Sequence, residues 1–229
     1  MIRREELAQI IDHSLLRPNL TADDIKKGCQ EAVSYGFATV VVNPAHVDIA
    51  VEIVRQSSTK VCSVISFPFG LSTTNAKVYE TRTALTQGAQ EIDMVMNYSA
   101  LRSDLNQLVL KDIKDVVDEA RSVSRGIVVK VILENCYLSN DEKVQACMLA
   151  VKAGADFVKT STGFGPSGAT LDDVRLMRKA IGPKTGVKAA GGIRTLDEAV
   201  RMIDAGANRI GTSTSVSIIE SLGGESHQR

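Results

Sequence analysis

Short apolar runs rich in β-branched residues alternate along the chain with longer stretches in which apolar residues recur every three or four positions. The short runs predict eight strands, near residues 10–13, 38–43, 61–67, 91–96, 127–133, 157–160, 186–189 and 209–211. The longer stretches predict helices at 22–35, 45–56, 72–87, 100–123, 141–153, 171–181, 196–205 and 213–222. Strict alternation of strand and helix predicts an α/β fold with parallel strands and helical crossovers.

Start and stop signals flank the predicted helices. A hydroxyl residue stands three positions before a carboxylate at four helix starts, a spacing typical of a capping box, at Thr21, Ser139, Thr170 and Thr195. Glycines follow five helix ends, where a left-handed C-cap is expected, at Gly36, Gly88, Gly154, Gly182 and Gly206. No stretch between these units has the composition of a linker, so we expect one domain over residues 1–229.

An internal repeat narrows the fold further. The segments 88–93, 154–159 and 206–211 each begin with Gly-Ala and align without gaps, so Asp93, Lys159 and Gly211 are equivalent positions on the fourth, sixth and eighth strands. Alternate strands of an eight-stranded barrel share one interior layer, and barrel active sites lie at the carboxyl ends of the strands. We therefore expect a single (β/α)8 TIM barrel with a short N-terminal helical extension. An open doubly wound sheet is the alternative.

Charge and composition narrow the classes of partner. Lys plus Arg and Asp plus Glu each number 27, without long runs of one sign, which argues against nucleic acid and membrane surfaces. The chain shows no apolar signal segment or membrane-spanning stretch, so we expect a soluble cytoplasmic protein. The cysteines form no CxxC pair and the histidines lack metal-ligand spacing. We therefore expect reduced structural thiols and no metal site.

Lysines on core strands are the main candidates for chemistry. Lys130, Lys159 and Lys188 all lie on predicted strands. A strand-end lysine can extend its ammonium into water, but three together suggest a common cause, such as an amine that forms a Schiff base with a carbonyl. We expect Lys159 to be this nucleophile and Lys188, on the next strand, to be its neighbour.

A neutral nucleophile requires a lowered pKa. Bringing the pKa of a lysine from about 10.4 to about 7 costs roughly 4.6 kcal/mol. A second ammonium about 6 Å away supplies roughly 2.8 kcal/mol of this at an effective dielectric of about 20, and burial can supply the rest. The sequence alone leaves open which amine of the pair loses its proton.

Carboxylates on neighbouring strands complete the candidate site. Asp93 is expected close to Lys159, where it could move protons at an iminium, and a plain ion pair with one of the lysines is the alternative. Lys130 and Glu134 share the parity of one strand, so both are expected to face the interior as supporting charge.

The loops after the seventh and eighth predicted strands have the composition of a phosphate site. They read Gly191-Gly192-Ile193-Arg194-Thr195 and Gly211-Thr212-Ser213-Thr214. Glycines let backbone N–H groups approach an anion, and each loop leads into a helix whose amino end is partly positive. Phosphate sites of barrels often lie at these two loops, so we expect a phosphorylated ligand.

Motifs over nearly the whole chain resemble the deoxyribose-phosphate aldolase family. They are Ile11-Asp12-His13-Ser14-Leu15-Leu16-Arg17-Pro18, Val42-Asn43-Pro44, Phe67-Pro68-Phe69-Gly70, Glu91-Ile92-Asp93-Met94-Val95, Lys159-Thr160-Ser161-Thr162-Gly163 and Val187-Lys188-Ala189-Ala190-Gly191-Gly192-Ile193-Arg194. The resemblance implies a class I aldolase of deoxyribonucleotide breakdown that needs neither metal nor cofactor. Such an enzyme reversibly cleaves 2-deoxy-D-ribose 5-phosphate into acetaldehyde and D-glyceraldehyde 3-phosphate.

The resemblance also implies roles for individual residues. Lys159 matches the Schiff-base lysine, Lys188 the lysine that perturbs it, and Asp93 the proton-relaying aspartate. Asp12 and Thr162 match polar groups near the substrate, with Lys130 added as a supporting charge. The phosphate site would comprise Gly163, Gly191, Gly192, Arg194, Gly211 and Ser213.

Three departures from the family pattern stand out. Asn135 replaces a small or hydroxyl residue, which could alter the site near Lys130. Phe164 stands where some members carry a phosphate-facing lysine, and the chain ends without the terminal tyrosine that some members use to shuttle protons.

Two rival functions stay open at this stage, namely an aldolase or transaldolase of another sugar phosphate, and a non-catalytic barrel that binds a phosphosugar. In each case we expect the protein to bind a phosphorylated sugar. For a deoxyribose-phosphate aldolase, acetaldehyde would be the other small-molecule partner. We also expect a homo-oligomer, either a dimer or a tetramer.

Overall fold

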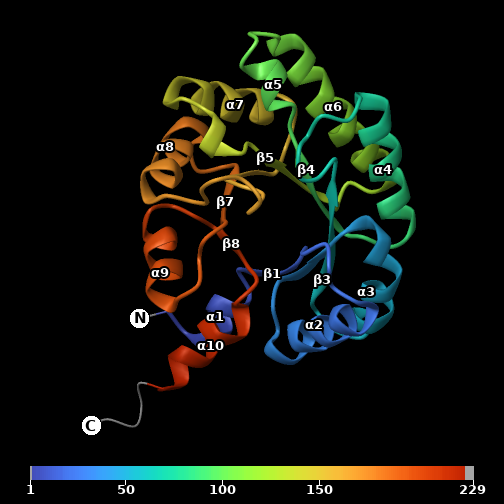
Figure 1. Cartoon of the computed structure of the whole chain (residues 1–229), viewed down its shortest axis with the longest axis vertical. Coiled ribbons are helices and arrows are strands. Elements are labelled where there is room, and N and C mark those ends of the chain that lie inside the picture. Colours follow the sequence, from blue (N-terminus) through green and yellow to red (C-terminus); the bar gives the residue numbers. More distant parts are fainter. Residues whose placement is uncertain (1, 225–229) are drawn as a thin grey trace.

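A computed structural model describes residues 2–224 as a closed barrel of eight parallel strands ringed by helices (Figure 1). Each strand pairs with the next along the chain, and the last pairs with the first. The strands are β1 (Ile11–Leu15), β2 (Thr39–Val42), β3 (Lys60–Ile65), β4 (Glu91–Val95), β5 (Val128–Ile132), β6 (Phe157–Lys159), β7 (Gly186–Ala190) and β8 (Arg209–Thr212). The closed barrel confirms the expected fold and rules out the open sheet. The end of the chain, which lacks the terminal tyrosine of some family members, lies outside the described residues.

The helices follow the predicted pattern with one correction. They are α1 (Arg4–Ala8), α2 (Ala22–Tyr35), α3 (Val47–Val54), α4 (Thr74–Thr86), α5 (Tyr98–Leu101), α6 (Asn106–Val123), α7 (Asn140–Lys152), α8 (Leu171–Ile181), α9 (Leu196–Asp204) and α10 (Ser215–Gly224). The single helix expected over 100–123 is wrong, because Asp104 takes a positive φ of 58° and the chain restarts as α6. Within residues 2–224, every helix is too short or too polar to cross a membrane.

Local signals in the sequence fix most helix ends. Three of the four predicted capping boxes form, at the starts of α2, α7 and α9. At α8, Thr170 accepts a hydrogen bond from the backbone N–H of Asp173 without the reciprocal bond. All five predicted C-cap glycines have positive φ, as expected for residues without a Cβ.

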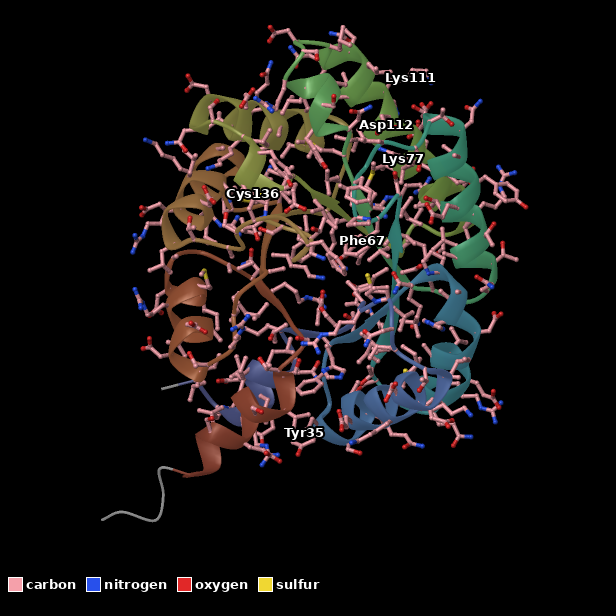
Figure 2. The ribbon with its side chains drawn as sticks, viewed as in Figure 1. Tyr35, Phe67, Lys77, Lys111, Asp112 and Cys136 are labelled. Carbon is pink, nitrogen blue, oxygen red and sulfur yellow. The ribbon has the colours of Figure 1, made fainter. Side chains whose placement is uncertain are left out.

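The interior of the barrel divides into an apolar and a charged region. On the side of β1 to β3 it holds a small apolar cluster of Leu16, Val41, Cys62 and Val64, with Phe67 packed against it. Figure 2 shows Phe67 near the centre of the ring of helices. Strand β1, through Asp12, and strands β4 to β8 direct charged side chains inward, and these make up the candidate site described below.

A buried ion pair outside the barrel secures the carboxyl end of β4. Lys77 of α4 and Asp112 of α6 pair with side chains that are 0% and 3% exposed, and Figure 2 shows them side by side. The Lys77 Nζ also donates a hydrogen bond of 3.0 Å to the carbonyl oxygen of Val95. This contact ties both helices to the strand that carries Asp93.

His13 gives the fold a predictable dependence on pH. Its ring stacks on Phe37 with centroids 5.5 Å apart, and Nδ1 lies 3.0 Å from the Ser215 Oγ. Burial lowers the pKa of His13 to about 4, whereas an unfolded histidine titrates near 6.5. The unfolded chain therefore binds more protons between these two values, so folding stability must fall as the pH drops through this window.

We expect this loss to reach about 3 kcal/mol for His13 alone between about pH 6.5 and 4. Urea unfolding of the wild type and of His13→Gln across this range measures it, because the glutamine does not titrate. The variant should show a shallower pH dependence than the wild type. Parallel curves for the two proteins would contradict the assignment.

Candidate active site

A cavity of about 350 Å³ opens at the carboxyl ends of the strands, bounded by the segments that follow β1, β6, β7 and β8. Eight of the twelve predicted site residues line it: Lys159, Thr162, Gly163, Gly191, Gly192, Arg194, Gly211 and Ser213. Among these, Lys159 is only 2% exposed, so its amine lies at the cavity floor. The proposed nucleophile and the proposed phosphate loops thus share one cavity.

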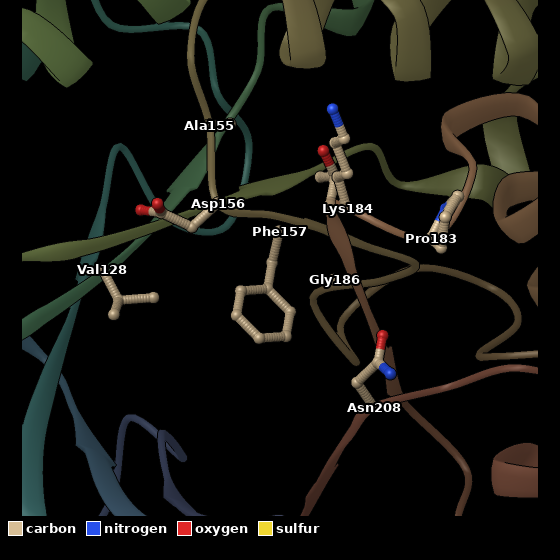
Figure 3. A pocket seen from close by; sticks show the side chains of 9 residues that line it. Val128, Ala155, Asp156, Phe157, Pro183, Lys184, Gly186 and Asn208 are labelled. Carbon is tan, nitrogen blue, oxygen red and sulfur yellow. The ribbon is translucent and has the colours of Figure 1, made fainter.

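Another cavity lies at the opposite end of the barrel. It measures about 510 Å³ and is lined by residues at the amino ends of β5 to β8, including Val128, Phe157 and Asn208 (Figure 3). None of the buried lysines lines it. Reactions in this fold take place at the carboxyl ends of the strands, so we take the cavity lined by Lys159 as the candidate active site.

Asp93 stands at the centre of the lysines. Lys159 and Lys188 are direct partners in the β6–β7 register, and their amines lie 2.8 Å and 2.7 Å from the same Asp93 Oδ2 atom. The two nitrogens are therefore less than about 6 Å apart, the separation at which like charges repel by roughly 2.8 kcal/mol at an effective dielectric of about 20. The Lys130 Nζ lies 2.8 Å from the other oxygen, Oδ1.

A second layer of charges lies beneath these contacts. Asp12 pairs with Lys188 at 2.5 Å, and Glu91 pairs with Lys130 at 2.6 Å. Arg209 reaches both carboxylates, with 2.7 Å to Asp12 Oδ1 and 3.3 Å to Glu91 Oε1. We call the whole set the barrel ion cluster: Asp12, Glu91, Asp93, Lys130, Lys159, Lys188 and Arg209.

The environment separates the pKa values of the two paired lysines. Burial lowers the pKa of Lys159, and the nearby Lys188 ammonium adds to this against the opposing effect of Asp93. Burial also acts on Lys188, but the carboxylates of Asp12 and Asp93 outweigh it and raise its pKa. Lys159 is therefore the amine that loses its proton more readily, and burial contributes more to this than the neighbouring ammonium that the sequence argument emphasised.

The charge balance of the barrel ion cluster agrees with this assignment. Three carboxylates face four basic groups, which leaves one positive charge in excess when every group is ionised. Unbalanced charge is costly in a buried site. A neutral Lys159 removes the excess, and the carboxylates raise the pKa values of Lys130 and Arg209 above their usual range despite burial.

Asp12 and Lys130 lie below the cavity. Both are fully buried and neither lines it, because their side chains pair within the barrel ion cluster. Glu134 was expected to follow the strand parity of Lys130. It lies beyond β5 with a φ of 56°, and its carboxylate instead accepts hydrogen bonds from the backbone N–H and hydroxyl of Thr162.

Asn135 turns away from the ion cluster. It is 1% exposed, and its Nδ2 lies 3.2 Å from the Met177 Sδ of α8. The carboxylate of the neighbouring Glu134 contacts the loop after β6, because its Oε1 accepts a hydrogen bond of 3.1 Å from the backbone N–H of Thr162. The side-chain hydrogen bond of Asn135 is therefore made to α8 and not to Lys130.

Sequence reasoning missed several groups around the site. Glu91 and Arg209 lie two residues before Asp93 and Gly211 in the internal repeat, so strand parity could have placed both inside the barrel. The Cys62 thiol lies 3.2 Å from the Asp93 Oδ1, and burial raises the pKa of this thiol. Arg17 lines the cavity from the segment after β1, and no sequence pattern pointed to it.

Residues 7–218 match the model of the DeoC/LacD family of aldolases. The chain belongs to this family. The aldolase is 54% identical over 224 residues to a deoxyribose-phosphate aldolase of Caldanaerobacter subterraneus, with 96% of each chain covered. It is also 54% identical to a protein of that name from Thermococcus kodakarensis, with 96% of this chain and 98% of the relative covered.

Solved structures give the same likeness. The deoxyribose phosphate aldolase of Aeropyrum pernix, described as a unique tetramer, matches the aldolase with a TM-score of 0.90 and 36% identity. The match covers 96% of this chain and 92% of that one. The shared barrel therefore extends over almost the full length of both proteins.

Proposed function

We propose that the protein is a deoxyribose-phosphate aldolase that reversibly cleaves 2-deoxy-D-ribose 5-phosphate into acetaldehyde and D-glyceraldehyde 3-phosphate. The observation that carries this proposal is Lys159, an amine with a lowered pKa at the floor of a cavity rimmed by glycine-rich loops. The names of relatives that match almost the whole chain support the choice of substrate.

Lys159 starts the reaction as a neutral amine. It attacks the aldehyde carbon of the open-chain sugar, and the resulting carbinolamine loses water to form an iminium. A base then removes the proton of the hydroxyl on the third carbon, the bond between the second and third carbons breaks, and D-glyceraldehyde 3-phosphate leaves. The iminium takes up the electron pair of the broken bond and becomes an enamine. Protonation of the enamine and hydrolysis release acetaldehyde and free Lys159 for the next cycle.

Asp93 is suited to manage the protons of these steps together with a water molecule. The ammonium groups around it outweigh burial and hold the pKa of its carboxyl well below its usual range, so it enters the cycle as a carboxylate. When Lys159 is neutral, Asp93 loses one of the three cations that contact it. Lys188 stays charged and provides a fixed positive field for the developing charges.

The phosphate is expected to bind at the loops after β7 and β8. Gly191 and Gly192 take positive φ values of 89° and 79°, which exposes their backbone to the cavity as few other residues could. Each loop continues into a helix amino end, α9 or α10, and Arg194 adds a full positive charge at the rim.

Borohydride trapping tests the mechanism directly. Incubation with deoxyribose 5-phosphate or acetaldehyde, followed by reduction, should add one covalent adduct per chain, and peptide mapping should locate it on Lys159. A folded protein that binds the sugar phosphate without forming an adduct would favour the non-catalytic barrel. A screen of aldehyde donors separates the aldolases, since only the proposed enzyme should prefer acetaldehyde.

Assembly and location belong to the same proposal. We propose a homo-oligomer, a dimer or a tetramer, supported by the tetramer described for the Aeropyrum pernix relative. Light scattering of the purified protein measures this. A cytoplasmic location fits an enzyme of sugar-phosphate metabolism, and cell fractionation tests it.

A further inference from the structure

The active-site cavity has a second cation besides Arg194. Arg17, in the segment between β1 and α2, lines the same cavity as Lys159, Arg194 and Ser213. Among the residues that the structure describes, no aspartate or glutamate lines this cavity. Two guanidinium groups thus border a cavity whose described lining holds no carboxylate, which favours a ligand that carries negative charge.

Both guanidinium groups are available to a ligand. Both side chains are exposed, and within the described part of the chain neither Arg17 nor Arg194 forms an ion pair. Other arginines of this protein, such as Arg82 and Arg121, bind a carboxylate at 2.7 Å. Cations left unpaired at the rim of a catalytic cavity are suited to charge recognition rather than to stability.

The barrel register explains why Arg17 faces the phosphate loops. Strand β1 pairs with β8, so His13 lies opposite Thr212, immediately before Ser213 and the amino end of α10. Leu16 packs into the apolar cluster inside the barrel. The next residue, Arg17, therefore leaves the barrel at its rim, on the side where the loop after β8 begins.

The loop after β6 supplies no cation to this cavity. Phe164 lines it instead, and its ring packs edge-on against Phe67 with centroids 5.3 Å apart and an interplanar angle of 89°. Among the described residues, the guanidinium groups that line this cavity are those of Arg17 and Arg194.

We propose that Arg17 is a specificity-determining residue that binds the phosphate monoester of the substrate together with Arg194. A guanidinium can bind two phosphate oxygens at once, whereas the ammonium of lysine acts as a point charge. Arg17 thereby selects phosphorylated over unphosphorylated sugars. This inference rests on the proposed function, because the substrate must carry a phosphate.

The preference for phosphorylated sugar measures the role of Arg17. We expect Arg17→Gln to lower the ratio of kcat/KM for deoxyribose 5-phosphate to that for deoxyribose by about 10-fold or more, equivalent to about 1.4 kcal/mol. Most of the loss should appear in KM, and it should shrink at high salt. Arg17→Lys should retain part of the preference. Arg55→Gln, at an exposed arginine after α3 without an ion pair in the described residues, should leave the ratio unchanged.

Calorimetry with inorganic phosphate tests Arg17 independently of catalysis. We expect the wild type to bind phosphate about 10-fold more tightly than Arg17→Gln. Equal phosphate affinities, or an unchanged kcat/KM ratio in an active enzyme, would overturn the role of Arg17. Failure of the proposed function looks different, because borohydride would then trap no adduct in the wild type while the difference in phosphate binding persisted.

Discussion

Lys159→Ala should abolish aldolase activity, with a loss of at least about 10⁴-fold in kcat, because no other amine of the described residues lines the cavity to form the imine. Lys188 and Lys130 are both fully buried. Neighbouring carboxylates raise the pKa values of both lysines and so keep them charged. Borohydride reduction should likewise give no adduct with this variant.

The same substitution should leave the fold intact. It removes the one basic group that the barrel ion cluster has in excess of its carboxylates, so the remaining three carboxylates and three cations balance. We therefore expect little change in urea unfolding. Lys60→Ala, at an exposed lysine that opens β3, is the matched control and should keep full activity. Activity of Lys159→Ala within about 100-fold of the wild type would contradict the Schiff-base role.

Asp93→Asn should destabilise the protein more than any other single change in the site. The carboxylate contacts three buried ammonium groups, and removal of one partner from a buried ionic group typically costs about 3–5 kcal/mol. We expect a loss of this size in the free energy of unfolding at neutral pH, together with loss of activity. Asp118→Asn, at an exposed ion pair with Lys114, should cost no more than about 1 kcal/mol.

The pH dependence of the stability of Asp93→Asn shows whether Asp93 stabilises the fold through its charge or through packing. Without the carboxylate, Lys159 loses its partner, and Lys130 and Lys188 keep only Glu91 and Asp12. Burial therefore lowers the pKa of Lys159 in the folded state further below its value in the unfolded state. The folded variant then binds fewer protons, so its stability should rise with pH and approach that of the wild type in alkali. Addition of Lys159→Met should restore part of the stability at neutral pH. A deficit that is constant across pH would show that Asp93 acts through packing alone.

The sequence by itself determined the architecture and pointed to the main candidate residues for chemistry. Strand and helix periodicity depends on local geometry, and the repeat at Asp93, Lys159 and Gly211 fixed which strands share an interior layer. Capping residues and C-cap glycines act within one helical turn, so most helix boundaries could be predicted. The break at Asp104 escaped prediction because no glycine or proline marks it.

Contacts between residues far apart in the chain were decided only by the tertiary structure. Asp12 and Arg209 are 197 positions apart and meet because β1 closes against β8. The carboxylate of Asp12 also helps to raise the pKa of Lys188, whereas burial lowers the pKa of Lys159, a distinction that strand parity cannot draw. Glu134 and Arg17 lie beyond the regular strands, where alternation no longer gives side-chain direction. Local pattern thus predicts the scaffold, whereas protonation and charge pairing depend on which distant groups the closed barrel brings within a few ångströms.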